Sequence, residues 1–144
     1  MKMLGFLILM IGFSAHASNP LMRACQRTNA SGFINIQVSG DQVMFCIYGS
    51  ALIDARSMLD AKFLDPANNN QTKISRAFSA AQGTGSNCQD AGGQVIDTNA
   101  NGTPVSLCAF GDHSFIEVNT LAGGSSAPAN SSLIQALNLP IFTD

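Results

Sequence analysis

Four cysteines, set in two pairs of nearly equal spacing, constrain this chain more than any other feature of its sequence. Cys25 and Cys46 stand 21 residues apart, and Cys88 and Cys108 stand 20 residues apart. In an oxidising compartment an even number of cysteines predicts disulfides. A four-cysteine zinc site is the alternative, but such sites usually bring their ligands in close pairs of the form C-x₂-C. The wide spacing found here favours disulfides.

Residues 1–17 have the layout of a cleavable export signal. Lys2 precedes an apolar run of about a dozen residues, and Ala15 and Ala17 then form an A-x-A cleavage pattern. The run is shorter than the roughly 20 apolar residues that a membrane span needs. A lipid anchor would require a cysteine at the cleavage point, and the first cysteine is Cys25. We therefore expect a soluble periplasmic or secreted protein that begins near residue 18 and is not a lipoprotein.

The two cysteine pairs lie within two stretches of similar sequence. Aligning Cys46 with Cys108 superimposes glycines, apolar residues and, after a shift of one residue, an Ile-acid pair. The matched positions are Ile34 with Ile96, Gly40 with Gly102, Val43 with Val105, Tyr48 with Phe110, Gly49 with Gly111, and Ile53-Asp54 with Ile116-Glu117. This order predicts a tandem repeat. Among the three pairings that four cysteines allow, the repeat favours Cys25–Cys46 and Cys88–Cys108.

Each repeat is predicted to contain a β-hairpin. Apolar and polar residues alternate over 33–38, and turn residues follow at 39–42, so residues 33–48 indicate two paired strands. Residues 95–110 repeat this pattern around Asn101-Gly102, a dipeptide typical of tight hairpin turns. Asn19-Pro20 predicts the start of a helix that presents Cys25. Residues 51–64 form either a third strand or a short helix.

These patterns predict an α+β fold of two pseudo-symmetric helix-plus-hairpin repeats, each holding one disulfide. Repeat 1 spans 18–65 and repeat 2 spans 88–122. A linker at 66–87 carries an amphipathic helix at 74–81, and 123–144 forms a flexible Gly-Ser linker and an apolar tail. The expected core, with the cysteines beside it, consists of Phe33, Ile34, Ile36, Val43, Phe45, Val95, Ile96, Val105, Leu107 and Phe110.

The repeat resembles a small family of secreted bacterial proteins that is catalogued as domain of unknown function 333 and often labelled haemolysin. Repeat 2 carries the resemblance through Cys88, Gln89, Gly92, Gly93, Gly102, Cys108, Ile116, Glu117 and Leu121, and repeat 1 through Asn19, Pro20, Cys25, Gly40, Cys46, Ile53 and Asp54. The family usually has a tryptophan in the closing segment, where this chain has none, and usually has one copy of the repeat. The resemblance implies export and a fold, without a mechanism.

The charge distribution excludes nucleic acid as a partner. Only 11% of the residues are charged, the formal net charge is −2, and the pI is about 5.5. A nucleic-acid-binding domain would show a basic face and a high pI. Every lysine and arginine precedes position 77, so the charged residues among the last 68 are all aspartate or glutamate.

No combination of residues in the sequence predicts catalysis, a cofactor or a metal site. His113 is the only histidine after the export signal, and no nucleophile or acid is placed to work with it, so we interpret it as a solvated turn residue. Asp54 and Glu117 occupy equivalent positions, where capping or surface acids are the ordinary explanation. We expect no catalytic residues and no metal.

The leading hypothesis is therefore a non-catalytic exported binding module, of the kind to which enzyme inhibitors belong. Its partner would be an unidentified protein or a component of the cell envelope, bound by paired loops at Gly49-Ser50 and Gly111-Asp112-His113. Membrane damage through amphipathic strands or the tail at 133–142 is an alternative, less favoured. A small hydrolase that uses Asp54, Glu117 or His113 is a second alternative.

Overall fold

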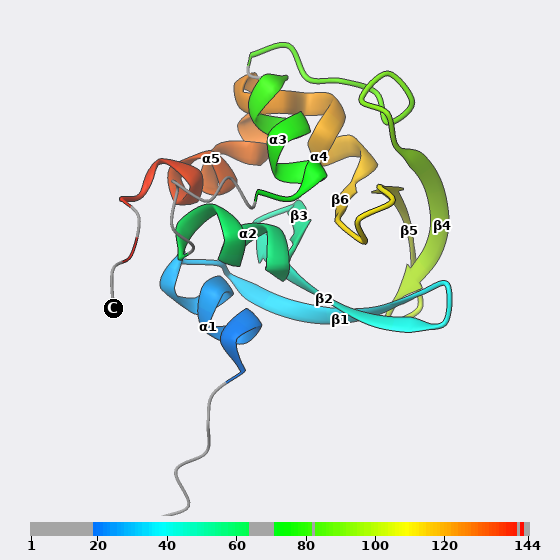
Figure 1. The fold of residues 1–144 in the computed structure, drawn as a ribbon, viewed down its shortest axis with the longest axis horizontal. Helices are drawn as coiled ribbons and strands as arrows, with labels where there is room; N and C mark the ends of the chain where they lie inside the picture. The colour runs from blue at the N-terminus through cyan, green and yellow to red at the C-terminus, as the bar shows by residue number, and fades with distance from the viewer. Residues whose placement is uncertain (1–18, 64–70, 82, 141, 143–144) are drawn as a thin grey trace, which may run out of the picture.

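The computed structural model describes residues 19–63, 71–81, 83–140 and 142 (Figure 1). The predicted export signal at 1–17 lies outside the described residues. The described residues form an antiparallel sheet and helices, as the α+β prediction required.

Two hairpins supply four of the six strands. The first joins β1 (Gly32–Val38) to β2 (Asp41–Tyr48), and the second joins β4 (Gln94–Ala100) to β5 (Thr103–Ala109). Both turns consist of two residues with positive φ, 51° and 92° at Ser39-Gly40 and 49° and 85° at Asn101-Gly102. Glycine at the second turn position adopts this geometry without steric cost. Both predicted hairpins are confirmed.

The segment after each hairpin is both strand and helix. β3 (Ala51–Asp54) runs directly into α2 (Ala55–Lys62), and β6 (Phe115–Glu117) runs directly into α4 (Val118–Gly123). The strand order is β1-β2-β3-β6-β5-β4, with every neighbouring pair antiparallel, so the order of elements is the same from either edge. The two halves meet at the centre, where β3 and β6 pair only through Ile53 and Ile116.

Three further helices complete the described fold, and the first two of them have side-chain N-caps. α1 (Pro20–Arg27) has Asn19 as its N-cap, whose side chain accepts a hydrogen bond from the backbone N–H of Leu21 at 3.0 Å. α3 (Lys73–Ala80) is the predicted amphipathic helix of the linker, and α5 (Ser131–Asn138) contains the apolar residues of the tail. Short 3₁₀ turns, η2 (Gly124–Ser126) and η3 (Pro128–Asn130), connect α4 to α5.

Both predicted disulfides are present. Cys25–Cys46 ties α1 to β2, and Cys88–Cys108 ties the segment before β4 to β5, with Cα–Cα distances of 5.2 and 5.4 Å. Among the described residues no cysteine is free. The second disulfide also explains a glycine, because a Cβ atom on Gly93 would lie 2.5 Å from the Sγ atom of Cys108.

The sheet has an apolar cluster on each face. One contains both disulfides and packs against the helices; its large members include Tyr48, Ile53, Met58, Ile74, Phe78, Ile116, Leu121 and Leu133. The other contains Ile36, Val38, Phe45, Leu107, Ala109 and Phe115. The sheet curls around this second cluster, so that its edge strands, β1 and β4, come into contact near the tips of the two hairpins (Figure 1).

Two sequence-based expectations differ from the structure. Phe33, expected in the core, has 39% of its surface exposed, because it shares a face of the edge strand β1 with Asn35 and Gln37. Residues 123–126, expected to be a flexible linker, are instead the end of α4 and the turn η2. Gly124 lets the chain approach closely here, since a Cβ atom on it would lie 2.4 Å from the backbone nitrogen of Gly85.

The apolar tail docks on the body of the protein. Leu133 and Ala136 of α5 are buried, and the Lys62 ammonium donates hydrogen bonds to the carbonyls of Leu137 and Leu139 at the end of the helix. A cation at this position complements the helix dipole. The backbone N–H of Phe142 also donates to the carbonyl of Lys62 at 2.8 Å. The tail is therefore part of the fold.

Candidate functional site

The structure places the two predicted binding loops at opposite ends of the sheet. Gly49-Ser50 precedes β3, and Gly111-Asp112-His113 precedes β6. Since β3 and β6 run antiparallel, their starting points lie apart, and the loops do not form one surface. A ligand that contacts one loop would therefore not contact the other at the same place. Each loop joins the second strand of a hairpin to the strand that follows it, so the two occupy corresponding places in the chain without being neighbours.

Asp54 and Glu117 are helix caps. Asp54 accepts hydrogen bonds from the backbone N–H of Ser57 at 2.8 Å and from its hydroxyl at 2.6 Å. Glu117 accepts the equivalent bonds from the backbone N–H and hydroxyl of Thr120 at 2.7 and 2.9 Å. Both acids satisfy N–H groups that the first helical turn leaves without partners. The structure therefore accounts for both acids as caps at the starts of α2 and α4.

The same caps join the two halves of the sheet. The Asp54 carboxylate accepts a hydrogen bond from the backbone N–H of Phe115 in β6 at 2.9 Å. In the reverse direction, the backbone N–H of Leu52 in β3 donates to the Thr120 hydroxyl at 3.2 Å. Each helix start thus binds the central strand of the other half.

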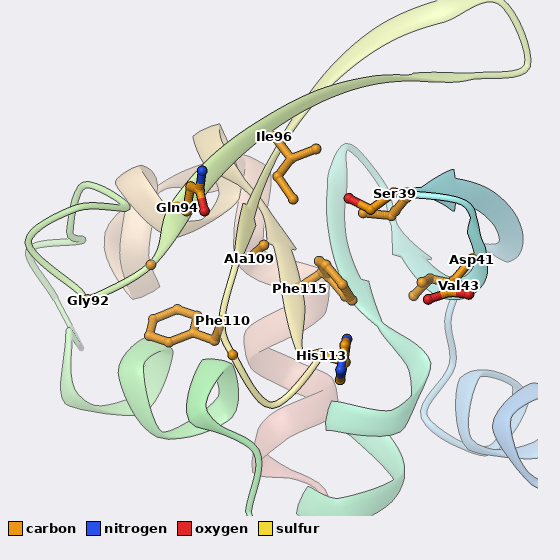
Figure 2. Close-up of a pocket in the computed structure, with 13 residues that line it drawn as sticks. Ser39, Asp41, Val43, Gly92, Gln94, Ile96, Ala109, Phe110, His113 and Phe115 are labelled. Atoms are coloured by element: carbon orange, nitrogen blue, oxygen red, sulfur yellow. The ribbon is translucent and has the colours of Figure 1, made fainter.

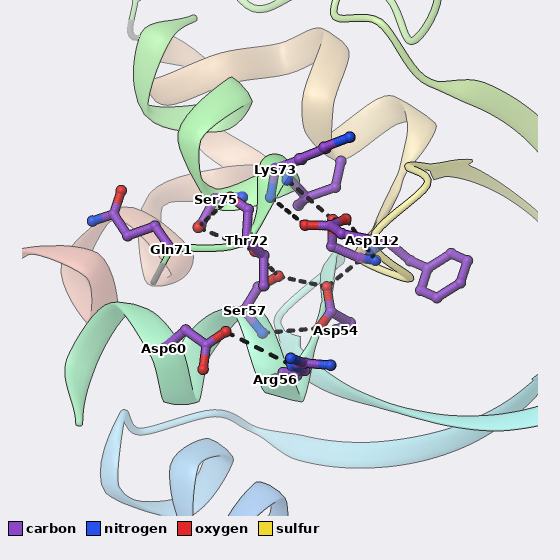
Figure 3. A network of polar contacts seen from close by, with 12 residues as sticks. Asp54, Arg56, Ser57, Asp60, Gln71, Thr72, Lys73, Ser75 and Asp112 are labelled. Atoms are coloured by element: carbon purple, nitrogen blue, oxygen red, sulfur yellow. Dashed lines mark hydrogen bonds and ion pairs between the residues drawn. The ribbon is translucent and has the colours of Figure 1, made fainter. Parts of the chain in front are cut away.

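Burial makes Asp54 the most perturbed carboxyl group of this network. The residue has only 1% of its surface exposed, and this burial raises its pKa to about 6. The bonds from Phe115 and Ser57 oppose the rise, and the nearby charge of Asp60 adds to it. Figure 3 shows the network continuing from Ser57 to the hydroxyl of Thr72, the N-cap of α3, at 2.6 Å. Ser57 is fully buried, which closes the network to a substrate.

Asp112 anchors α3. Its carboxylate accepts a hydrogen bond from the backbone N–H of Lys73 at 2.7 Å and bonds from the backbone and hydroxyl of Ser114 (Figure 3). The Ser114 hydroxyl in turn accepts from the backbone N–H of Ile74 at 3.2 Å. Partial burial opposes ionisation of Asp112, but the bonds from Ser114 and Lys73 outweigh it and hold its pKa below the usual value. The hydrogen bonds of Asp112 therefore stabilise the fold, and we do not assign it a role in ligand binding.

His113 is exposed on the loop that precedes β6, as predicted, with φ at 60°. None of the carboxylates of the described residues lies within hydrogen-bond distance of its ring. Asp54, Glu117 and His113 make no hydrogen bond to one another, so the structure does not assemble the group of residues that the hydrolase hypothesis requires. His113 does, however, line a cavity.

This cavity has a volume of about 720 Å³ and opens between the tip of the first hairpin and the beginning of β4 (Figure 2). We call it the seam cavity, because it lies where the edge strands β1 and β4 diverge. Apolar residues from both halves form much of its lining, and exposed polar residues surround the opening. The apolar members are Val38, Val43, Ile96, Ala109, Phe110 and Phe115, and the polar members are Ser39, Asp41, Gln94 and His113.

Sequence reasoning missed the seam cavity, although it identified some of its residues. Val43 and Ile96, expected in the core, pack against the second apolar cluster but are only half-buried. The curl of the sheet is what brings these residues of opposite halves together, and no local pattern encodes it. Of the predicted loop residues, Gly111 and His113 line the cavity, whereas Gly49 and Ser50 do not.

Two further features of the described residues bear on the kind of site. No group of three or more histidine, cysteine, aspartate or glutamate side chains among them could hold a metal ion. None of the helices in the described part is both long and apolar enough to cross a membrane.

No known family model, curated protein or solved structure matches this chain. The resemblance to domain of unknown function 333 therefore remains a prediction from the repeat motifs.

Proposed function

We propose that the chain is an exported, non-catalytic binding module and that the seam cavity is its ligand site. The observation that carries the proposal is the cavity itself, whose largely apolar lining and polar opening are typical of binding sites. The two disulfides support export, because such bonds persist in oxidising compartments. The predicted cleavable signal at 1–17 would direct export of the chain. The resemblance to domain of unknown function 333, a family of secreted proteins, agrees with that location.

The disulfides also favour binding in a physical sense. They tie α1 to β2 and the segment before β4 to β5, which limits the motion of the cavity walls. A site that is ordered before binding loses less conformational entropy when the ligand arrives. An inhibitor-like role, in which a preformed surface occupies a partner, fits this property.

The two alternative functions receive less support. Membrane damage through the tail would require α5 to leave a site in which Leu133 and Ala136 are buried and Lys62 holds the end of the helix. A hydrolase would require Asp54, Glu117 and His113 to cooperate, and they lie in separate bonding networks.

The proposed function is tested by capture of partners from the periplasm and culture medium of the source organism. The immobilised wild-type protein is compared with Ile96→Trp, which fills the cavity, and with Asn99→Trp, which adds the same side chain at an exposed position of β4 outside the lining. We expect material, protein or small molecule, to be retained by wild type and Asn99→Trp and lost from Ile96→Trp. Equal retention by all three, or retention by none, contradicts a ligand site in the cavity.

A further inference from the structure

The seam beside the cavity leaves backbone hydrogen-bonding groups without partners. β1 and β4 are the outer strands of the sheet order, and no strand pairing joins them although the curl of the sheet brings them into contact. Across the seam, the side-chain hydroxyl of Thr98 donates a hydrogen bond to the carbonyl of Gln37, at 2.8 Å. Unpaired strand edges of this kind are templates for a further strand.

The turn geometry identifies which groups face the seam. A two-residue turn joins Ala100 to Thr103, so these residues exchange backbone hydrogen bonds, and every second residue back along β4 does the same with β5. Asn99 pairs with Pro104, which has no N–H group. This agrees with the alternation, because Asn99 and Pro104 form a non-hydrogen-bonded pair. By the same alternation, the backbone N–H and C=O groups of Val95 and Asp97 point away from β5 and into the seam.

β1 confirms this assignment independently. Its two-residue turn makes Val38 and Asp41 a hydrogen-bonded pair, so the backbone groups of Gln37 face the seam. The carbonyl of Gln37 is the group that accepts the bond from Thr98 across the seam. Beyond this contact the hairpin tip and the beginning of β4 diverge around the seam cavity, where Ile96 lines the wall between Val95 and Asp97 (Figure 2).

The residues that line the seam cavity indicate two chemical features of its ligand. Val43, Ala109 and Phe115 give the cavity an apolar interior that suits a hydrophobic side chain. Asp41 at the opening is exposed, and no lysine or arginine lines the cavity. A basic side chain on the ligand would therefore meet a complementary charge. His113 is the only other titratable side chain of the lining.

On the basis of the proposed function, we propose that the ligand is an extended segment of a partner protein. The segment adds as a strand to the seam edge of β4, bonding to the backbone groups of Val95 and Asp97. One of its apolar side chains enters the seam cavity, and a basic side chain beside it contacts Asp41. Strand addition of this kind takes affinity from main-chain hydrogen bonds and specificity from pockets for alternate side chains.

The test is a selection of random eight-residue peptides on the immobilised, disulfide-intact protein. Peptides that also bind Ile96→Trp are discarded, and Asn99→Trp serves as the matched control that should retain them. We expect enrichment of sequences with an apolar residue next to a lysine or arginine. Asp41→Lys, a substitution at an exposed position, should weaken these peptides about tenfold and favour versions in which an acid replaces the base.

Backbone methylation then distinguishes strand addition from other binding. One enriched peptide is made with single N-methyl groups at successive positions. Methylation of the amides that pair with β4 should weaken binding at least tenfold, because each loses a hydrogen bond and gains a clash, whereas methylation of the intervening amides should have little effect. An alternating pattern supports the proposal, and a uniform effect or none overturns it.

The outcomes separate this inference from the proposed function. If selection yields no peptide that depends on Ile96, while partner capture still depends on it, strand addition is wrong and the binding module stands. Native mass spectrometry that shows a small molecule displaced by Ile96→Trp has the same meaning. Dimers of the protein that Asp41→Lys and Ile96→Trp abolish would assign the edge to a second copy and overturn the proposal. If nothing depends on Ile96 in either experiment, both proposals fail.

Discussion

Asp54 should make the stability of this protein fall as the pH rises from 4 to 7.5. Its pKa of about 6 in the folded protein exceeds the ordinary value near 3.8, so the folded state binds the proton more tightly than the unfolded state. The resulting stabilisation is complete below pH 4 and is lost as the pH passes through 6. A shift of roughly 2 pKa units corresponds to about 3 kcal/mol, and the burial of the side chain means that solvent screening removes little of it.

The measurement is urea unfolding followed by circular dichroism at pH 4 and pH 7.5, with both disulfides intact. Other carboxyl groups also respond to pH, among them Asp112, whose lowered pKa acts in the opposite direction. The informative quantity is therefore the difference between wild type and Asp54→Asn at each pH. Asp54→Asn should lower the free energy of unfolding at both pH values, because its amide group places a donor where the carboxylate accepts from the N–H of Phe115 or Ser57. Between pH 4 and 7.5, wild type should lose up to about 3 kcal/mol relative to the variant.

Glu117→Gln is the matched control, since it removes a charge from the equivalent cap at a half-buried position. A difference between wild type and Asp54→Asn that is the same at both pH values would refute the reasoning. So would an equal pH-dependent change in Glu117→Gln, because the effect would then not arise from the burial of Asp54.

Three further outcomes follow from the packing. Lys62→Met should cost about 1–3 kcal/mol of unfolding free energy, because two carbonyls at the end of α5 lose their donor, and chymotrypsin should then cleave the tail faster. Gly93→Ala should destabilise by about 1–3 kcal/mol, because its new methyl group meets the sulfur atoms of the second disulfide, whereas Gly111→Ala, with open space around it, should stay within about 0.5 kcal/mol in the same urea titration. Replacing Cys25 and Cys46 together by serine should cost roughly 3 kcal/mol, and non-reducing peptide mapping of wild type should recover this pair as one crosslink; two free thiols in native material would contradict it.

Local patterns in the sequence predicted the elements well, because each depends on neighbouring residues. Alternation over 33–38 and the turn at Asn101-Gly102 predicted the hairpins, and Asn19-Pro20 predicted the start of α1. The spacing of the cysteines, read through the repeat, predicted both disulfides. The interpretation of the two halves as a duplication remains a prediction, which the matching strand order supports.

The arrangement of these elements in space could not be predicted in the same way. The seam cavity depends on the curl of the sheet, and the separation of the two predicted loops depends on the antiparallel meeting of β3 and β6. Phe33 shows how far residue type alone can mislead. Its apolar side chain suggested a place in the core, but its position in the strand puts it on the polar face. The Gly-Ser composition of 123–126 suggested a flexible linker, whereas Gly124 allows the chain to approach Gly85 closely.

The single residue pair at the centre of the sheet has a consequence for how this molecule unfolds. Ile53 and Ile116 alone cannot hold two modules together, so the reciprocal bonds from Leu52 to Thr120 and from Phe115 to Asp54 complete the junction. Removing either half would leave a backbone amide of the other without its acceptor and expose the strand that now lies at the centre of the sheet. Neither half is thus equipped to exist as a separate domain, and melting should proceed as one concerted transition in which both halves lose structure together.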